Sequence, residues 1–319
     1  MKYMNYLNYL FMFFMLMLIS KLYNNFKEHY LEDENANHYK IVNKYLLNDN
    51  SLAKNNKPYL WIHNSFEINS INWSSFGSRN SKCMNQPYKY ITIKSVIDKC
   101  GDDFNICVID DNIFTKIIPN WNINISLIAE PLKTNIRKLA IAQILYIYGG
   151  LLVPNSFICY KSLIDLYENG VKDNKILVND FNFLDKQNKS NVKFLGCEKN
   201  SKAMKEYILY LEKVNSKDFS SENKFLEYDK NWFKYNNTKK NNNIISNQSI
   251  GLSDIDNIKV TLDKLMGNTY FELIEDIYGL YIPDEEILKR TKYQWFARLS
   301  VEQVLLSNTM LGKYILLCN

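Results

Sequence analysis

The sequence predicts an α/β domain, a mixed sheet flanked by helices, which follows an N-terminal segment of different character. Short apolar runs alternate with longer stretches in which apolar residues recur at helical spacing. With 319 residues, 46% of them hydrophobic, the chain can bury a large core, so wholesale disorder is excluded. We expect a membrane anchor over residues 1–22, a stalk or linker over 23–56 and one globular domain over 57–319.

The N-terminal segment contains one unbroken apolar run, LFMFFMLMLIS, from Leu10 to Ser20. A cleaved signal peptide and a buried helix are the alternatives, but Ser20 begins no small-x-small cleavage site and a soluble helix would show a polar face. We therefore expect a single-pass membrane anchor. Lys2 on one side and Lys21 and Lys27 on the other favour a cytosolic globular domain, and a lumenal domain is the alternative.

The first part of the globular domain has the pattern strand, helix, strand. Pro58–His63 is a short apolar run after a proline, which predicts a buried strand. Asn85–Cys100 carries its apolar residues on one helical face, and Gly101 follows as a stop signal. Phe104–Ile109 is a second apolar run and predicts the next strand.

The strongest helix signal follows at Pro131–Tyr148, where an apolar stripe ends at Gly149. Gly150 then leads into an apolar strand at Leu151–Cys159. The later predicted elements are a helix at Lys161–Glu168, strands at Lys175–Val178 and Val192–Gly196, a helix at Ser201–Asn215, an irregular insertion or loop at Phe219–Ser253, and helical structure from Tyr281 to Leu317 that starts at Pro283, Asp284 and Glu285.

Two candidate catalytic residues, Asp110 and Asp111, follow the second predicted strand directly. Sheets of this class bind ligands at the carboxyl ends of their strands, so either carboxylate is placed to hold a ribose hydroxyl or a metal ion. The alternative is structural, because an Asp-Asp-Asn run also forms turns and caps helices.

The segment Leu139–Phe157, LAIAQILYIYGGLLVPNSF, resembles the central motif of DXD-type glycosyltransferases, the group that includes capsular-polysaccharide sugar transferases and large clostridial toxin glucosyltransferases. Those enzymes have a helix carrying D-x-x-R, a Tyr-Gly-Gly turn and a strand that ends in D-x-D. The resemblance rests mainly on Leu145 and the Tyr148–Gly150 turn and covers about Pro58–Leu166. It implies a GT-A-like fold and transfer of a sugar from a nucleotide-sugar donor to a glycan or protein acceptor.

The charged positions of that motif are replaced in this chain. The D-x-D positions fall on Pro154 and Ser156, and the D-x-x-R positions fall on Lys138 and Ile141. In the family, the D-x-D carboxylates neutralise the departing diphosphate through Mn²⁺ or Mg²⁺. Asn155 and Ser156 offer neutral oxygens, which bind such an ion weakly when alone.

The resemblance assigns substrate-binding positions to Trp61, Arg137, Gly149, Gly150, Asn155 and Ser156. Arg137 lies one helical turn before Ile141 and is placed to substitute in part for the missing arginine from the same face. Trp61 matches a tryptophan that lies near the nucleotide base in the family, and a core position is its alternative. The two glycines allow the helix to stop and the strand to turn tightly.

Two functions follow from this pattern. The first is a membrane-anchored glycosyltransferase-like protein with little or no metal dependence, in which Asp110 and Asp111 compensate for the missing D-x-D carboxylates. The cofactor compatible with this function is Mn²⁺ or Mg²⁺ bound together with the nucleotide sugar. The second is a catalytically inactive scaffold or binding protein of a viral membrane or virion. The segments WSSFGSRN, QPYKYITIKSVI and RTKYQWFARLS resemble those of proteins encoded by large DNA viruses of the mimivirus and algal-virus kind.

Charge and cysteine usage argue against other classes. The net charge is +5 and the basic residues are spread along the chain, so no nucleic-acid partner is expected. The six cysteines form no CxxC pair and the three histidines form no ligand set with them, so we predict no resident metal site. Buried free thiols are the favoured state of the cysteines, and disulfides are the alternative in a lumenal domain.

Overall fold

The computed structural model describes Met15 and residues 17–21, 57–64, 86–180, 192–216, 231–233, 235–236 and 241–318. The chain forms two compact units, Met1–Lys44 and Tyr45–Asn319. In the first unit, Met15 and residues 17–21 are helical and exposed. Among the described residues, no helix is long and apolar enough to cross a membrane. Most of the predicted anchor and all of the predicted stalk lie outside the described residues.

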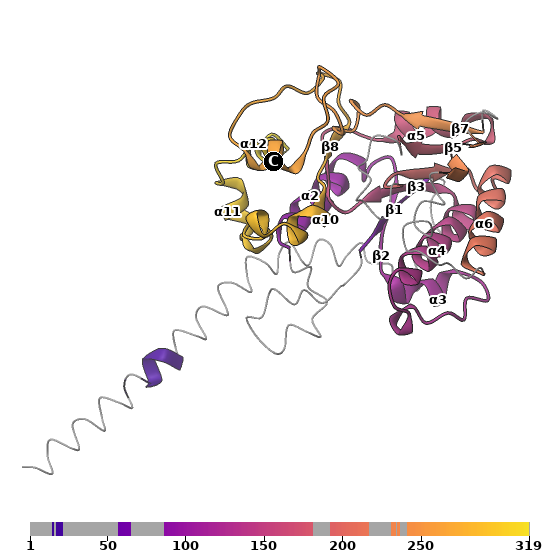
Figure 1. The fold of residues 1–319 in the computed structure, drawn as a ribbon, viewed down its shortest axis with the longest axis horizontal. Helices are drawn as coiled ribbons and strands as arrows, with labels where there is room; N and C mark the ends of the chain where they lie inside the picture. The colour runs from indigo at the N-terminus through magenta and orange to yellow at the C-terminus, as the bar shows by residue number, and fades with distance from the viewer. Residues whose placement is uncertain are drawn as a thin grey trace, which may run out of the picture. The chain divides into compact units, whose positions relative to one another are not determined.

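The second unit contains a six-stranded mixed sheet flanked by helices (Figure 1), which confirms the predicted α/β class. Its strand order is β2-β1-β3-β6-β5-β7. β6 runs antiparallel to both of its neighbours, and the other adjacent pairs are parallel. In chain order the strands are β1 (Tyr59–His63), β2 (Asn105–Ile109), β3 (Gly150–Pro154), β5 (Ile176–Asn179), β6 (Leu195–Cys197) and β7 (Asn242–Ile245).

The long helices of this unit end where the sequence predicts. Gly101 ends α2 by donating its backbone N–H to the carbonyl of Ile97, and Gly149 ends α4 with a φ of 74°. α4 and α6 pack together, and their buried residues form one core with the inward side chains Trp61 and Ile109. The helices around the sheet are α2 (Tyr88–Cys100), α3 (Phe114–Ile117), α4 (Leu132–Tyr148), α5 (Ile164–Val171) and α6 (Lys202–Asn215).

A second core lies in the C-terminal part, where β4 (Phe157–Cys159) pairs antiparallel with β8 (Gly279–Tyr281). The prediction of one strand over Leu151–Cys159 is wrong, because a turn at Asn155 and Ser156 separates β3 from β4. The short helices of this part are α9 (Leu262–Met266), α10 (Asp284–Lys289), α11 (Val301–Leu305) and α12 (Met310–Leu316).

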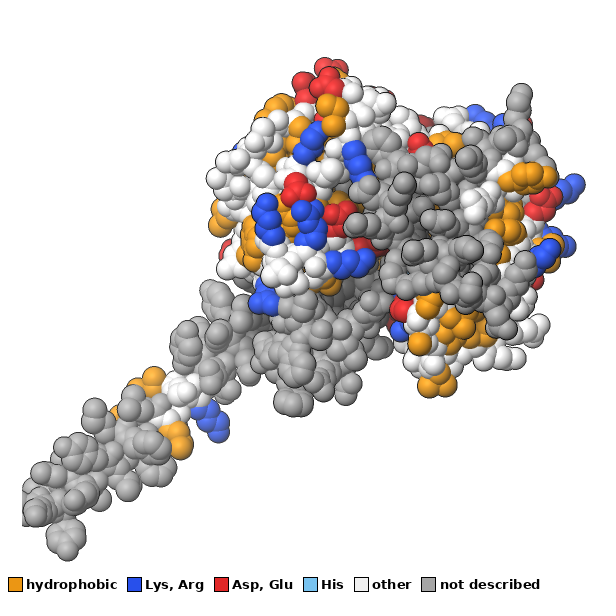
Figure 2. All heavy atoms as spheres, in the orientation of Figure 1, with side chains coloured by type: hydrophobic (Ala, Val, Ile, Leu, Met, Phe, Trp, Pro, Cys, Tyr) orange, Lys and Arg blue, Asp and Glu red, His pale blue; other side chains and the backbone are white. Residues whose placement is uncertain are grey.

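β7 lies inside the stretch that the sequence predicts as an insertion or loop. Its residues Asn242 and Asn243 give no apolar signal, yet Asn242 is buried and donates its side-chain amide to the carbonyl of Phe233 at 3.2 Å. This hydrogen bond satisfies the amide nitrogen of Asn242, which would otherwise oppose burial; the amide oxygen is buried and forms no hydrogen bond with the described residues. On the face shown in Figure 2, basic and acidic side chains of the C-terminal part lie next to one another, consistent with the even spread of charge along the sequence.

Candidate functional site

The sheet contains a reversal of strand order between β1 and β3. β1 is followed along the chain by β2 on one side, and the chain then crosses to β3 on the other side of β1. In open α/β sheets, ligands bind outside the carboxyl ends of the strands at such a reversal. The residues at this edge, here called the carboxyl edge, are His63 at the end of β1 and Asn64 after it, Asp110 and Asp111 after β2, and Asn155 and Ser156 after β3.

Two side-chain amides connect the strands across the reversal. Asn155 donates its Nδ2 to Oδ1 of Asn64 at 2.9 Å, and the Asn64 side chain is almost fully buried. The backbone N–H of Asn64 donates to the carbonyl of Ile109, and Thr92 of α2 donates its hydroxyl to the carbonyl of Asn155 at 2.6 Å. The ends of β1, β2 and β3 are therefore held together by polar contacts.

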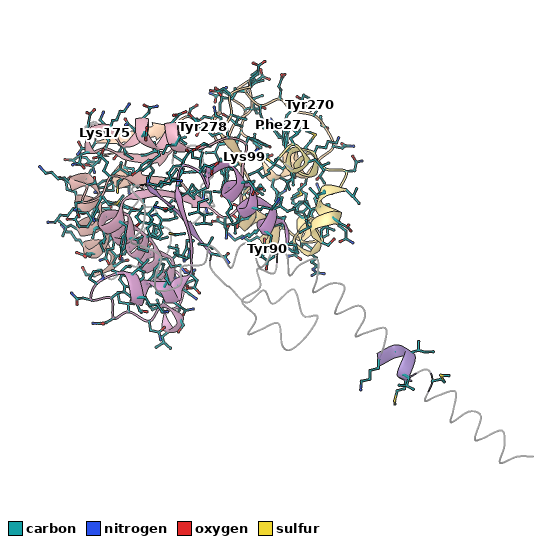
Figure 3. All side chains as sticks on the ribbon, turned by 180° about the vertical axis from the view of Figure 1, so that it is seen from behind. Tyr90, Lys99, Lys175, Tyr270, Phe271 and Tyr278 are labelled. Carbon is teal, nitrogen blue, oxygen red and sulfur yellow. The ribbon has the colours of Figure 1, made fainter. Side chains whose placement is uncertain are left out.

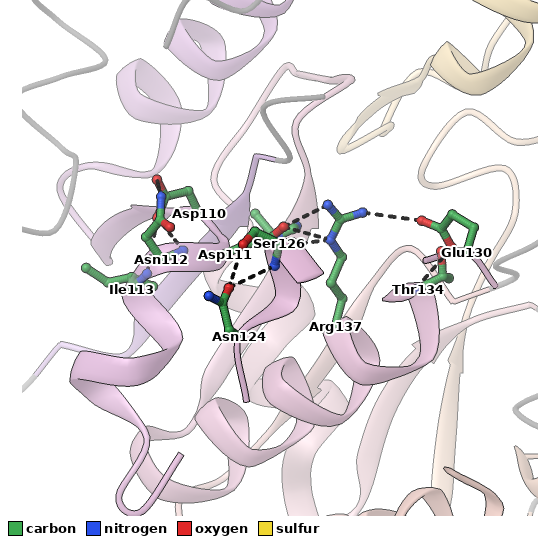
Figure 4. Close-up of polar contacts among 10 residues, drawn as sticks. Asp110, Asp111, Asn112, Ile113, Asn124, Ser126, Glu130, Thr134 and Arg137 are labelled. Carbon is green, nitrogen blue, oxygen red and sulfur yellow. Dashed lines mark hydrogen bonds and ion pairs between the residues drawn. The ribbon is translucent and has the colours of Figure 1, made fainter. Parts of the chain in front are cut away.

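An ion pair occupies the β2 side of the carboxyl edge (Figure 4). Arg137 donates from Nε to both carboxylate oxygens of Asp111 at 3.0 Å and from a terminal nitrogen to Oδ2 at 2.7 Å. His63 contacts Oδ1 of Asp111 at 3.0 Å, and a second carboxylate, Glu130, lies 3.8 Å from the guanidinium. The end of α4 connects directly to the start of β3, so the first turns of α4 lie beside the carboxyl end of β3. Arg137 belongs to these first turns and therefore lies at the carboxyl edge.

Asp110 has a local role beside this ion pair. Its carboxylate accepts the backbone N–H groups of Asn112 at 3.0 Å and Ile113 at 3.2 Å, and it also accepts from the Asn112 side chain. These contacts cap the short 3₁₀ helix that follows β2, as the structural alternative from the sequence describes. Of the two adjacent carboxylates, Asp110 shapes the turn and Asp111 pairs with Arg137.

The pKa of Asp111 is held well below its usual range. Burial alone would raise this pKa, but the hydrogen bonds and charges of His63 and Arg137 outweigh burial. A carboxylate with a lowered pKa in the folded state contributes stability that is complete above its unfolded pKa of about 3.9 and is lost as the pH falls below that value.

We therefore expect Asp111→Asn to lower the free energy of unfolding by about 2 kcal/mol at pH 7, since it removes hydrogen bonds to a charged group. The difference from the wild type should shrink as the pH falls below about 4, where Asp111 itself becomes protonated. Urea unfolding followed between pH 7 and pH 2.5 measures both quantities. The exposed Asp102 supplies a control, because Asp102→Asn should leave the dependence of unfolding free energy on pH unchanged. If the wild type and Asp111→Asn differed in unfolding free energy by the same amount at every pH, the ion pair would be contradicted.

A second group of charged residues lies at the β3 side of the carboxyl edge. Ser156 donates its hydroxyl to Oδ1 of Asp284 at 3.2 Å, and Lys89 of α2 contacts Oδ2 of Asp284 at 2.7 Å. The next carboxylate along the chain, Glu285, pairs with Lys193. Lys193 precedes β6, and because β6 is antiparallel its start lies at the same edge as the ends of β1 and β3. We call these five residues the α10 clasp.

Two residues of the α10 clasp, Asp284 and Lys193, have pKa values set by charge pairing. Burial would raise the pKa of Asp284, yet the ammonium groups of Lys89 and Lys193 lower it. Burial would likewise lower the pKa of Lys193, and the carboxylate of Glu285 raises it well above the usual range. Asp284 and Lys193 therefore stay charged near neutral pH. Sequence analysis missed this group, because it identified Asp284 and Glu285 only as helix-start acids.

Three residues that the resemblance assigns to substrate binding lie elsewhere. Trp61 is 1% exposed and donates its indole N–H to the carbonyl of Gly149 at 2.9 Å, so it is a core residue and offers no ring face to a base. Gly149 and Gly150 lie at the start of β3, at the edge opposite Asn155. A Cβ at Gly150 would lie 2.2 Å from the carbonyl oxygen of Tyr59. The backbones of β1 and β3 are therefore too close for any side chain at this position, which explains the glycine.

The side chains at the D-x-D positions do not fit a divalent cation. At these two positions Pro154 has no side-chain oxygen and Ser156 donates its hydroxyl to Asp284, and the Asn155 between them donates its amide to Asn64. None of the three supplies the carboxylate oxygen that Mn²⁺ and Mg²⁺ prefer. Within the part of the chain that the structure describes, no three His, Cys, Asp or Glu side chains gather in an arrangement that could hold a metal ion.

Comparison with known proteins finds no similar protein. No protein-family model matches the chain, and neither a curated protein nor a solved structure shows significant similarity to it.

Proposed function

We propose that the chain binds a nucleotide sugar at the carboxyl edge and is a glycosyltransferase-like protein. The observation that carries the proposal is the placement of Arg137, Asn64 and Asn155 along the carboxyl edge next to the reversal of strand order, where open α/β sheets bind their ligands. A guanidinium and two amides supply the hydrogen bonds that a diphosphate and the hydroxyl groups of a sugar or ribose require.

The frame of the domain supports a GT-A-like assignment. The Tyr-Gly-Gly turn that carries the resemblance joins α4 to β3 in this structure, with Tyr148 as the last helical residue and Gly150 as the first residue of the strand. The mixed six-stranded sheet with flanking helices is the architecture that the resemblance implies. Since fold alone does not imply function, the site has to be tested directly.

Arg137 is the group we assign to the diphosphate. Its guanidinium can form paired hydrogen bonds with phosphate oxygens in the same geometry that it uses with Asp111. In this proposal Asp111 is the counter-ion that holds the guanidinium at the edge, and the phosphate competes with Asp111 for it. Because the residues at the D-x-D positions do not fit a divalent cation, we derive no step that uses a metal.

A second candidate function, an inactive scaffold of the same fold, is favoured by the state of the carboxylates. Asp110 caps a turn, Asp111 pairs with Arg137, and Asp284 pairs with Lys89. A protein that binds the donor without transferring the sugar needs none of these carboxylates to be free. Turnover therefore separates the two functions: release of sugar from the donor by the full-length chain indicates a transferase, and binding without release indicates a scaffold or binding protein.

Binding is tested by thermal unfolding of the full-length chain with UDP, GDP, CMP and their sugars, with and without Mn²⁺. A ligand present at about 100 times its Kd should raise Tm by about 5 °C, because it binds only the folded state. Arg137→Met should abolish the shift. Arg290 is the matched control, since it also pairs with an aspartate, Asp263, but lies in the C-terminal part; Arg290→Met should keep the shift.

Asp111→Asn distinguishes the role proposed for this carboxylate from the catalytic role that the sequence suggests. If Asp111 is the counter-ion of Arg137, removal of its charge frees the guanidinium and nucleoside diphosphates bind more tightly. If Asp111 holds a ribose hydroxyl or a metal, the same substitution weakens binding. A full nucleotide panel that produces no shift, while stabilising a control transferase, would overturn the proposal.

A further inference from the structure

Two buried cysteines lie in contact on the side of α2 away from the carboxyl edge. Cys100 is the last residue of α2 and Cys159 is the last residue of β4, and their sulfur atoms are 3.8 Å apart. Both side chains are completely buried, and both thiols are free. In Figure 3 the labelled Lys99 and Tyr278 mark this region, where the end of α2 lies beside the β4–β8 pair.

The surrounding contacts hold the two sulfur atoms together. The backbone N–H of Cys159 donates to the hydroxyl of Ser95, one turn before the end of α2, at 2.9 Å. The Cys159 sulfur also contacts the carbonyl of Lys161 at 3.1 Å, and the partly exposed Cys318 contacts the carbonyl of Cys159 at 3.6 Å. Each element is therefore fixed by hydrogen bonds close to its cysteine, and disulfide formation requires the two sulfur atoms to approach from 3.8 Å to about 2.05 Å.

The two thiols differ in acidity. The hydrogen bond with Cys159 lowers the pKa of Cys100, while the same contact and burial raise the pKa of Cys159. Burial raises the pKa of Cys107 to about 12. Since the thiolate is the nucleophile in cysteine oxidation, the lower pKa favours Cys100 as the attacking sulfur when local opening admits peroxide to the buried pair.

We propose that Cys100 and Cys159 are a modification site that closes to a disulfide when the protein meets a small peroxide such as hydrogen peroxide. The Cys100 thiolate attacks one peroxide oxygen, the O–O bond breaks, and Cys100 becomes a sulfenic acid while hydroxide leaves. The Cys159 sulfur then attacks the Cys100 sulfur and expels a second hydroxide. The protons of the two thiols convert both hydroxides to water, so two thiols lose two electrons and one peroxide is reduced to two waters.

The test uses the full-length chain, treated with hydrogen peroxide and then alkylated under denaturing conditions. Peptide mapping by mass spectrometry should recover the Cys100 and Cys159 peptides as one cross-linked species that separates on reduction. The cross-link closes a loop between residues 59 positions apart, so oxidation should also raise Tm by about 5–10 °C, reversibly with dithiothreitol.

Cys100→Ala should abolish both the cross-link and the rise in Tm. Cys197 provides the matched control, since it is equally buried and its sulfur contacts a backbone carbonyl instead of a thiol; Cys197→Ala should keep both effects. The proposal is overturned if the wild-type chain accumulates sulfinic acid at Cys100 without a cross-link, if Cys159 is recovered fully alkylated, or if Cys100 pairs with another cysteine. These outcomes are read from the wild-type protein and stay decisive even if a variant fails to fold.

Discussion

Replacing Asp284 by alanine is expected to lower the free energy of unfolding by about 3 kcal/mol, because the substitution removes one partner of a buried ion pair. Asp284 holds Lys89 at 2.7 Å and accepts the hydroxyl of Ser156, and the side chains of Lys89 and Asp284 are only 11% and 17% exposed. Without the carboxylate, the Lys89 side chain would lose its charged partner in a place that water reaches poorly.

Urea unfolding of the full-length chain measures this effect, and Asp263→Asn is the control. Like Asp284, Asp263 pairs with a basic residue, in this case Arg290. The side chain of Asp263 is 51% exposed, so removal of its charge should lower the free energy of unfolding by less than about 1 kcal/mol. The double variant Lys89→Met/Asp284→Leu removes both charges and should recover much of the stability lost in Asp284→Ala. Equal losses for Asp284 and Asp263 would contradict a structural role for the α10 clasp.

Gly150→Ala is expected to destabilise the domain by about 4 kcal/mol or to prevent its folding. A Cβ at this position would meet the carbonyl oxygen of Tyr59 at 2.2 Å, and the φ of 105° is unfavourable for any residue with a side chain. The obstructing atom belongs to the backbone of β1, which is paired on both sides, so it cannot move aside without disturbing the sheet.

The matched control for Gly150→Ala is Gly196→Ala, in the strand next to β3. A Cβ there would meet a side-chain methyl of Leu151 at 3.1 Å, and that side chain can adjust. We expect a cost of about 1 kcal/mol for Gly196→Ala. Thermal unfolding and soluble yield report both variants, and a Gly150→Ala protein with wild-type Tm would show that the β1–β3 backbones are farther apart than described.

The helices and strands that were predicted correctly are those whose pattern lies in neighbouring residues of the sequence. α4 is predicted at Pro131–Tyr148 and observed at Leu132–Tyr148, since an apolar stripe and a terminal glycine are both readable from adjacent residues. β7 was missed because Asn242 and Asn243 gain their place in the sheet from hydrogen bonds to other segments. The division of Leu151–Cys159 into two strands is visible in the sequence as the turn-forming residues Pro154, Asn155 and Ser156, but the prediction gave more weight to the apolar residues on both sides of them.

Only those residues of the candidate site that directly follow a strand could be predicted from the sequence. Asp111 follows a strand, and its location at the carboxyl edge is therefore visible in the sequence. Its pairing with Arg137 depends on how α4 is placed, and the contact between Lys89 and Asp284 joins residues 195 positions apart. No local pattern encodes such a contact, because it arises from the topology that brings α2 and α10 to the same strand end.

The contact between Ser156 and Asp284 also limits how this chain can change. An aspartate at position 156 would place a second carboxylate beside the one that already holds Lys89. Two carboxylates this close cannot both stay ionised easily, so one would bind a proton instead of serving as a metal ligand. A pair of free carboxylates in the β3–β4 turn would therefore require coordinated substitutions in that turn and in α10. A carboxylate at position 156 alone would therefore disturb the contacts of Asp284 without adding a metal ligand.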